Sequence, residues 1–181
     1  MSINIFSACL FTTKAFENIM KYDCTDASIT IFDAEYTIDI NMLSEIIINY
    51  PTDFIIVLNN RNHSPIMIAK RIIILSKHTS VNIIKKIIYS ICFFREIKSK
   101  TISLSPHEKV FFDYWLGGET INFIAEHMSI TPKTANNIKN NIYKKYGTKD
   151  LLTFLLISKV SNMRGISNAK HYRITSFCRA A

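Results

Sequence analysis

The sequence predicts an α/β N-terminal domain built on a parallel sheet, followed by an all-α domain of four helices. Residues 1–95 alternate short β-branched apolar runs with helical patterns, whereas residues 104–160 contain helical patterns alone, separated by turn and capping residues. The 181 residues are 48% hydrophobic and include only four Gly and four Pro. This composition supplies apolar side chains for two small cores and leaves no room for a long flexible linker.

Four short apolar runs in the first part predict buried strands, at residues 3–6, 29–32, 54–58 and 71–75. Three segments between and after these runs have helical spacing, at residues 13–20, 40–49 and 81–94. Strands that alternate with helices in this way predict a parallel sheet with helices on both faces.

The second part opens with a strong helix start. Ser105 can cap, Pro106 suits the first helical position, and Glu108 completes a capping box. This helix ends at the glycines 117 and 118, and a second helix follows at once. A turn of only three residues, 129–131, then leads into a third helix, so the sequence predicts a helix-turn-helix.

The cap residues of the later helices support this division. Thr120 can cap the second helix, and Thr131 with Pro132 can open the third. Asp150 can cap a fourth helix, which extends to Val160 and is apolar on nearly all sides.

The third helix has two contrasting faces. Helical spacing places an apolar set on one side, namely Ala135, Ile138, Ile142 and Tyr146. The opposite side holds Lys133, Asn137, Asn140 and Lys144, flanked by Asn136 and Asn141. No carboxylate occurs from residue 132 to residue 149, whereas an ordinary solvated face mixes both signs. Lys neutralises phosphates and Asn pairs with adenine in the major groove, so this face predicts DNA contact.

Charge supports the same interpretation. Of the 22 Lys and Arg residues 11 lie after residue 100, where only 5 of the 14 acidic residues lie, in a chain of net charge +8. The excess of positive charge therefore accompanies the predicted DNA-binding part.

The motifs of residues 104–147 resemble, in order and spacing, the DNA-binding domain of LuxR/FixJ/NarL-type bacterial transcription regulators. They are LSPHEK at 104–109, Gly-Gly at 117–118, IAE at 124–126, ITPKT at 130–134 and NIYKKYG at 141–147. The resemblance implies base reading by Asn136, Asn137 and Asn140. It implies backbone contacts by Lys133, Thr134, Lys144 and Lys145. Asn141 flanks the same face.

Ser129 departs from the resembling family, which usually has Gly at this place in the turn. The position commonly needs a left-handed backbone, which costs a non-Gly residue about 1–2 kcal/mol.

In the same family the fourth helix is the usual dimer interface. This implies dimerisation through Leu151, Leu152, Leu155 and Leu156. The alternative is that this apolar helix packs under the N-terminal domain.

The N-terminal part resembles a degenerate response-regulator receiver. Asp33 stands at the place of the phosphoacceptor, Lys77 matches the receiver lysine, and Asn59 stands near the switch position. Ser7 and its neighbours replace the acidic pair that would hold magnesium, so we expect Asp33 and Lys77 to form a structural ion pair without a metal. The short spacing before Asp33 also predicts the loss of the second strand or helix. This pattern resembles that of auxiliary regulators of enteric bacteria.

The remaining expectations complete the interpretation. Residues 96–103 are expected to be a linker and the basic tail, 161–181, to be disordered. Neither a catalytic residue set nor a metal or cofactor site is found. The cysteines 9, 24, 92 and 178 show no zinc spacing and suggest buried or free thiols in a reducing cytoplasm. No apolar run reaches transmembrane length, and the N-terminus lacks a signal-peptide pattern.

The predicted function is that of a sequence-specific DNA-binding transcription regulator in the bacterial cytoplasm, associated with the nucleoid. It is expected to be independent of phosphorylation and to act on double-stranded DNA as a homodimer or as a heterodimer with another LuxR-type regulator. Two alternatives stay open at this point: a phosphorylation-controlled response regulator, and a protein-interaction antagonist that heterodimerises with another regulator.

Overall fold

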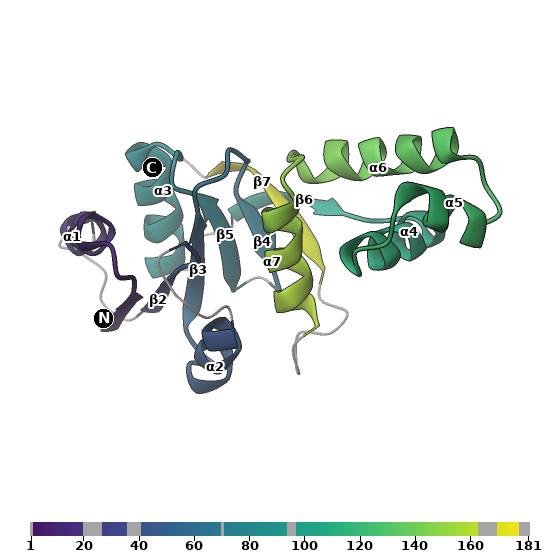
Figure 1. Cartoon of the computed structure of the whole chain (residues 1–181). Helices are drawn as coiled ribbons and strands as arrows, with labels where there is room; N and C mark the ends of the chain where they lie inside the picture. The colour runs from purple at the N-terminus through teal and green to yellow at the C-terminus, as the bar shows by residue number, and fades with distance from the viewer. Residues whose placement is uncertain are drawn as a thin grey trace.

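A mixed sheet forms the centre of the protein (Figure 1). The structure is a computed structural model that describes residues 2–19, 27–35, 41–69, 71–93, 97–162 and 170–177. Within these residues the sheet has seven strands in the order β1-β2-β3-β5-β4-β7-β6. In chain order they are β1 Ser2–Phe6, β2 Ser28–Asp33, β3 Phe54–Asn59, β4 Ile66–Ile68, β5 Ile72–Ser76, β6 Ile97–Ile102 and β7 His171–Phe177.

The parallel part of the sheet confirms the predicted fold class. Strands β1, β2, β3 and β5 pair in parallel, and each overlaps one of the four apolar runs of the sequence. Helices α1 (Leu10–Ile19) and α3 (Val81–Cys92) cover one face, and α2 (Asn41–Asn49) lies on the other (Figure 1). Neighbouring strand residues belong to different core clusters, because both faces of the sheet are buried.

The sheet also has the shortened form that the sequence predicts. Asp33 ends the second strand of the chain, and the single helix α1 connects β1 to β2. Among the described residues no strand pairs with the outer edge of β1. Within the described residues, a single helix thus connects the first strand to the strand that ends in Asp33, as the short spacing before Asp33 led us to expect.

Two expectations about segments outside the domains are wrong. Residues 97–102, within the expected linker, form strand β6. Residues 171–177, within the expected disordered tail, form strand β7, which lies antiparallel between β4 and β6. The rest of the tail, 163–169 and 178–181, lies outside the described residues. Strand pairing between segments about 70 residues apart leaves no local sequence signal, so neither strand was predicted.

The all-α domain contains the four predicted helices: α4 Pro106–Leu116, α5 Ile121–His127, α6 Pro132–Tyr146 and α7 Leu151–Ser161. Helix α7 lies between the other three and the sheet (Figure 1). Its residues Leu156 and Val160 are fully buried in the same apolar cluster as Ile66 and Ile68 of β4. The alternative that α7 packs under the N-terminal domain is therefore confirmed.

Polar contacts reinforce this packing. The Asn59 amide at the end of β3 donates to the Thr153 hydroxyl of α7 over 3.2 Å, and both side chains are fully buried. Arg61 lies 3.5 Å from the Asp150 carboxylate, which caps α7. The Lys159 amine donates to the Asn41 side chain of α2 over 2.7 Å. Residues at the start, middle and end of α7 thus bond to the N-terminal domain.

The cysteines only partly follow the sequence expectation. Cys9 is a free thiol, whereas Cys92 at the end of α3 is disulfide-bonded. The expectation of a thiol is therefore wrong for Cys92. Cys24 and Cys178 lie outside the described residues.

Candidate nucleic-acid interface

Every helix of the all-α domain begins at the cap that the sequence predicts. Ser105 and Glu108 form the capping box: the Glu108 backbone N–H donates to the Ser105 hydroxyl over 3.3 Å, and the Ser105 N–H donates to the Glu108 carboxylate over 2.7 Å. Thr120 and Thr131 each accept from the N–H three residues later, over 3.2 Å. These bonds satisfy N–H groups that a helix start otherwise leaves open.

The turn between α5 and α6 has a left-handed residue at Ser129, the position where the resembling family usually has Gly. Ser129 adopts φ 54°, so the expected left-handed backbone is confirmed. A non-Gly residue in this conformation costs about 1–2 kcal/mol. The backbone of Ile130 then donates to the Ala125 carbonyl over 2.9 Å. The fully buried Ala125 side chain leaves space for α6 to approach α5 closely.

Aromatic side chains fix the orientation of α6. The Tyr146 ring stacks on Phe112 of α4, with centroids 5.9 Å apart and planes 3° from parallel. Phe154 of α7 meets the same Tyr146 ring edge-on at 5.3 Å. Ala135 and Ile142 are fully buried on the same side of α6, and Ile138 is half-buried there. The inner face of α6 is therefore the predicted one.

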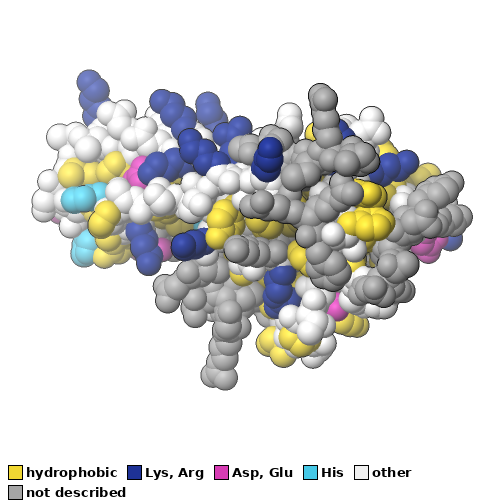
Figure 2. Space-filling view, turned by 180° about the vertical axis from the view of Figure 1, so that it is seen from behind, with side chains coloured by type: hydrophobic (Ala, Val, Ile, Leu, Met, Phe, Trp, Pro, Cys, Tyr) yellow, Lys and Arg dark blue, Asp and Glu magenta, His cyan; other side chains and the backbone are white. Residues whose placement is uncertain are grey.

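The outer face of α6 is open to solvent along its whole length. All eight side chains predicted to contact DNA are exposed: Lys133, Thr134, Asn136, Asn137, Asn140, Asn141, Lys144 and Lys145. Helix α6 runs along the outer side of the molecule (Figure 1), and Lys and Arg side chains gather along this side in Figure 2. The exposed face offers amide groups and cations and contains no carboxylate, so it suits a polyanion with hydrogen-bonding bases.

Comparison with known proteins assigns this domain. Residues 102–156 match the family model described as bacterial regulatory proteins, luxR family. Residues 102–156 form a LuxR-family domain. The match covers the caps, the left-handed turn and most of the α6–α7 unit, so this part of the chain is a DNA-binding domain of the luxR-family type. A comparison of the sequence with curated proteins finds no match.

One solved structure extends the likeness of fold to both domains. The chain is similar to RcsB from Salmonella enterica serovar Typhimurium bound to promoter rprA, with 18% identity, TM-score 0.53, and coverage of 83% of this chain and 97% of that one. This likeness shows a shared two-domain fold. Another RcsB–DNA complex has 18% identity, TM-score 0.48 and coverage of 88% and 98%. Full-length FixJ from B. japonicum has 12% identity, TM-score 0.38 and coverage of 87% and 95%.

Within the LuxR-family domain, Lys145 has an internal partner that the sequence did not reveal. Its amine lies 2.5 Å from the Glu108 carboxylate and donates to the Ser103 carbonyl over 2.9 Å. Burial favours the protonated acid, but the bonds from Lys145 and the Ser105 backbone outweigh it and hold the pKa of Glu108 below its usual range. Lys145 thus joins α6 to the start of α4, whereas Lys144 has no carboxylate partner among the described residues.

The predicted dimerisation residues on α7 separate into two groups. Leu151 is 48% exposed and Leu155 is 40% exposed, and Leu152 is half-buried. Leu156 is fully buried between α7 and the sheet. Leu156 is therefore not on a surface that a second copy can reach in this arrangement, and its predicted place in a dimer interface is wrong for this structure.

The receiver-like site holds the predicted ion pair. The Lys77 amine lies 2.8 Å from the fully buried Asp33 carboxylate, whose other oxygen accepts from the Ser7 hydroxyl over 2.8 Å. Lys77 also lies 3.5 Å from Glu35. Ser7 thus stands beside Asp33 where a receiver has a metal-binding acid. The described part of the chain contains no group of three or more His, Cys, Asp or Glu side chains able to hold a metal.

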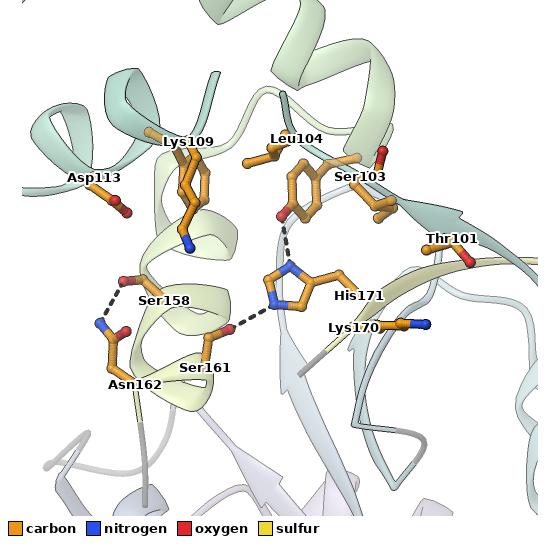
Figure 3. A pocket seen from close by; sticks show the side chains of 13 residues that line it. Thr101, Ser103, Leu104, Lys109, Asp113, Ser158, Ser161, Asn162, Lys170 and His171 are labelled. Atoms are coloured by element: carbon orange, nitrogen blue, oxygen red, sulfur yellow. Dashed lines mark hydrogen bonds between the residues drawn. The ribbon is translucent and has the colours of Figure 1, made fainter. Parts of the chain in front are cut away.

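A pocket of about 420 Å³ lies where the LuxR-family domain meets strands β6 and β7 (Figure 3). His171 of β7 lies at its inner side, between the Tyr146 hydroxyl at 2.7 Å and the Ser161 hydroxyl at 2.8 Å. Burial lowers the pKa of His171 to about 4, so the ring is neutral near pH 7. None of these contacts was predicted, because strand β7 was not predicted.

No described helix is long and apolar enough to cross a membrane.

Proposed function

We propose that this protein is a sequence-specific DNA-binding regulator of transcription that reads bases through Asn136, Asn137 and Asn140 of α6. Lys133, Thr134 and Lys144 contact the DNA backbone on either side of these asparagines. Asn141 flanks the same face of α6. The observation that supports this most directly is the outer face of α6, which is fully exposed, lacks carboxylates and is backed by a packed aromatic core. Asn is the side chain whose amide matches adenine, and Lys provides phosphate affinity.

Two matched substitutions on α6 test this proposal. In the full-length protein, Asn137→Ala should weaken binding to the preferred site by about 1–3 kcal/mol and reduce the preference for that site over a scrambled duplex. Lys144→Ala should weaken both duplexes alike and lower the salt slope of the affinity by about 1. Fluorescence anisotropy at several salt concentrations measures both effects. Lys85→Ala, on an exposed position of α3, is the control.

The proposal fails if no duplex binds at low salt while the protein remains folded. Equal and sequence-independent losses in Asn137→Ala and Lys144→Ala would instead show that asparagine does not read bases. The preferred site is obtained beforehand by selection from a random duplex pool.

Control by this protein is proposed to be independent of phosphorylation. Phosphoryl transfer to a carboxylate requires a cation that neutralises the incoming charge, normally a metal held by neighbouring acids. Asp33 instead bonds to the Ser7 hydroxyl and the Lys77 amine, and it is fully buried. The site therefore has the character of a structural ion pair.

The outer side of α7 is the proposed dimer contact. Leu151 and Leu155 are one helical turn apart and both are exposed, so they form a short apolar strip beside Leu152. A second copy, or another LuxR-type regulator, would cover this strip and place two recognition helices on a two-fold-related DNA site. Action on chromosomal DNA would place the protein in the bacterial cytoplasm, at the nucleoid.

A further inference from the structure

We infer that strands β6 and β7, here called the ribbon, extend the DNA-binding surface beyond α6 and contact the phosphate backbone through Lys100 and Arg173. This inference rests on the proposed function, because it assigns a second contact region to the same DNA ligand. The ribbon consists of residues that the sequence suggested to be a linker and a disordered tail. It lies outside the matched LuxR-family segment except at Ile102.

The ribbon is attached to the last turn of the recognition helix by three separate contacts. The Lys145 amine donates to the carbonyl of Ser103, which directly follows β6. The Tyr146 hydroxyl bonds to His171 at the start of β7 over 2.7 Å. Gly147, which ends α6 with φ 72°, lies against Arg173: a Cβ at this glycine would stand 3.1 Å from the guanidinium carbon. The position of the ribbon beside α6 is therefore fixed.

Arg173 lies on the side of the ribbon that faces the end of α6. His171 and Arg173 are two residues apart on one strand, so their side chains leave the same face of the sheet. Lys100 is the direct cross-strand partner of Arg173, and it lies on the outermost strand with its side chain exposed. Both cations are thus on the face that continues from the last turn of α6, where Lys144 is exposed.

Within the part of the chain that the structure describes, no carboxylate compensates the charges of Lys100 and Arg173. Like charges placed directly opposite each other on neighbouring strands destabilise a sheet. Among the described residues neither Lys100 nor Arg173 has a carboxylate within ion-pair distance. The nearest cross-strand neighbour of Arg173 on its other side is Ile66, which is apolar. A bound polyanion would relieve this repulsion, and each phosphate contact would add counterion release to the affinity.

Two other roles can account for cations at these positions. A Lys on an edge strand prevents unwanted pairing with another sheet, and Lys100 lies on such a strand. A cation near a helix C-terminus stabilises the helix, and Arg173 lies beside the end of α6. Neither role predicts an effect on the salt dependence of DNA binding, so that quantity separates them from DNA contact.

The test measures DNA affinity of the full-length protein as a function of salt, with a mixed-sequence duplex of about 30 base pairs as the probe, since phosphate contacts do not depend on sequence. Lys100→Gln should lower the slope of log affinity against log salt by about 1 and weaken binding about tenfold near 50 mM salt. Lys100→Arg should restore both values. Arg173→Gln should act in the same direction, and its thermal unfolding is recorded alongside because Arg173 is half-buried.

Lys85→Gln, at an exposed position of α3 on the opposite face of the sheet, is the matched control and should leave the slope unchanged. The inference is overturned if Lys100→Gln has the same slope as Lys85→Gln, including the case in which Lys100→Gln only increases self-association. If Lys100→Gln does behave like Lys85→Gln, a reduced slope of log affinity against log salt in Lys144→Gln would show that α6 still binds DNA. Absence of salt-dependent binding in every variant and in the unchanged protein would overturn the proposed function itself.

Discussion

His171 should make the stability of this protein depend on pH in a defined range. The ring lies between the Tyr146 hydroxyl of α6 and the Ser161 hydroxyl of α7. The Ser161 hydroxyl donates to the Ile157 carbonyl over 2.6 Å, so it accepts from the ring at Nε2, and Nδ1 accepts from Tyr146. The neutral ring therefore has both nitrogens bonded. Protonation would place a charge on a half-buried ring, in a pocket whose lining also includes Lys109, Asp113 and Lys170 (Figure 3).

The sign and size of the effect follow from the two protonation equilibria. The pKa of His171 is about 4 in the folded protein, because burial disfavours the charged ring, against 6.5 for a free imidazole. Between these values the unfolded chain binds more protons, so stability falls as the pH falls from 6.5 towards 4. The complete shift corresponds to about 3 kcal/mol, and about 2 kcal/mol of it is lost between about pH 7.5 and about pH 5.

Urea unfolding of the full-length protein and of His171→Gln at these two pH values measures the difference. Gln is neutral at both values, so the loss of stability on acidification should be about 2 kcal/mol smaller in the variant. His63 serves as an internal control: burial also lowers its pKa, and it titrates in both proteins. The reasoning is refuted if acidification destabilises both proteins equally.

The remaining predictions concern the turn, the receiver-like site and α7. Ser129→Gly should raise the free energy of unfolding by about 1 kcal/mol, because Gly adopts the left-handed backbone without a clash; an unchanged denaturation midpoint would contradict this. Asp33→Asn should leave DNA affinity unaltered, and acetyl phosphate should not label the unchanged protein; stoichiometric labelling that Asp33→Asn removes would restore phosphorylation control. Leu155→Glu should reduce the dimer fraction in light scattering while circular dichroism stays the same, whereas Leu156→Glu should unfold the protein, since Leu156 is fully buried. Dimers that persist in a folded Leu155→Glu protein would rule out the proposed contact.

The features that the sequence predicted correctly are those encoded within a few residues. Ser105, Thr120, Thr131 and Asp150 all form the expected caps, because each bond joins residues only three apart. The two faces of α6 followed from its helical period alone. The left-handed turn at Ser129 was recognised because the resembling family usually has Gly at this position.

Features that depend on distant segments were missed or misassigned. Strand β4 has only three residues, and β6 alternates Lys with small and apolar residues, so neither forms an apolar run. Their pairing with β7 joins segments far apart in the chain. Lys145 was assigned to DNA because its partner Glu108 is 37 residues away. Leu156 was assigned to a dimer because a helix that is apolar on nearly all sides does not show which of its sides meets which partner.

The packing of α7 limits how this regulator can change state. Thr153 bonds to the end of β3, and Leu156, Ile157 and Val160 follow on the same side of the helix, all fully buried. Exposing three such side chains costs about 1.5–3 kcal/mol each, so lifting α7 off the sheet would cost roughly 5–9 kcal/mol. That is comparable with the whole stability of a typical small domain. A signal received by the sheet is therefore expected to shift α7 and the attached α6 by small amounts. Release of the LuxR-family domain as a separate body would require most of the free energy that keeps the chain folded.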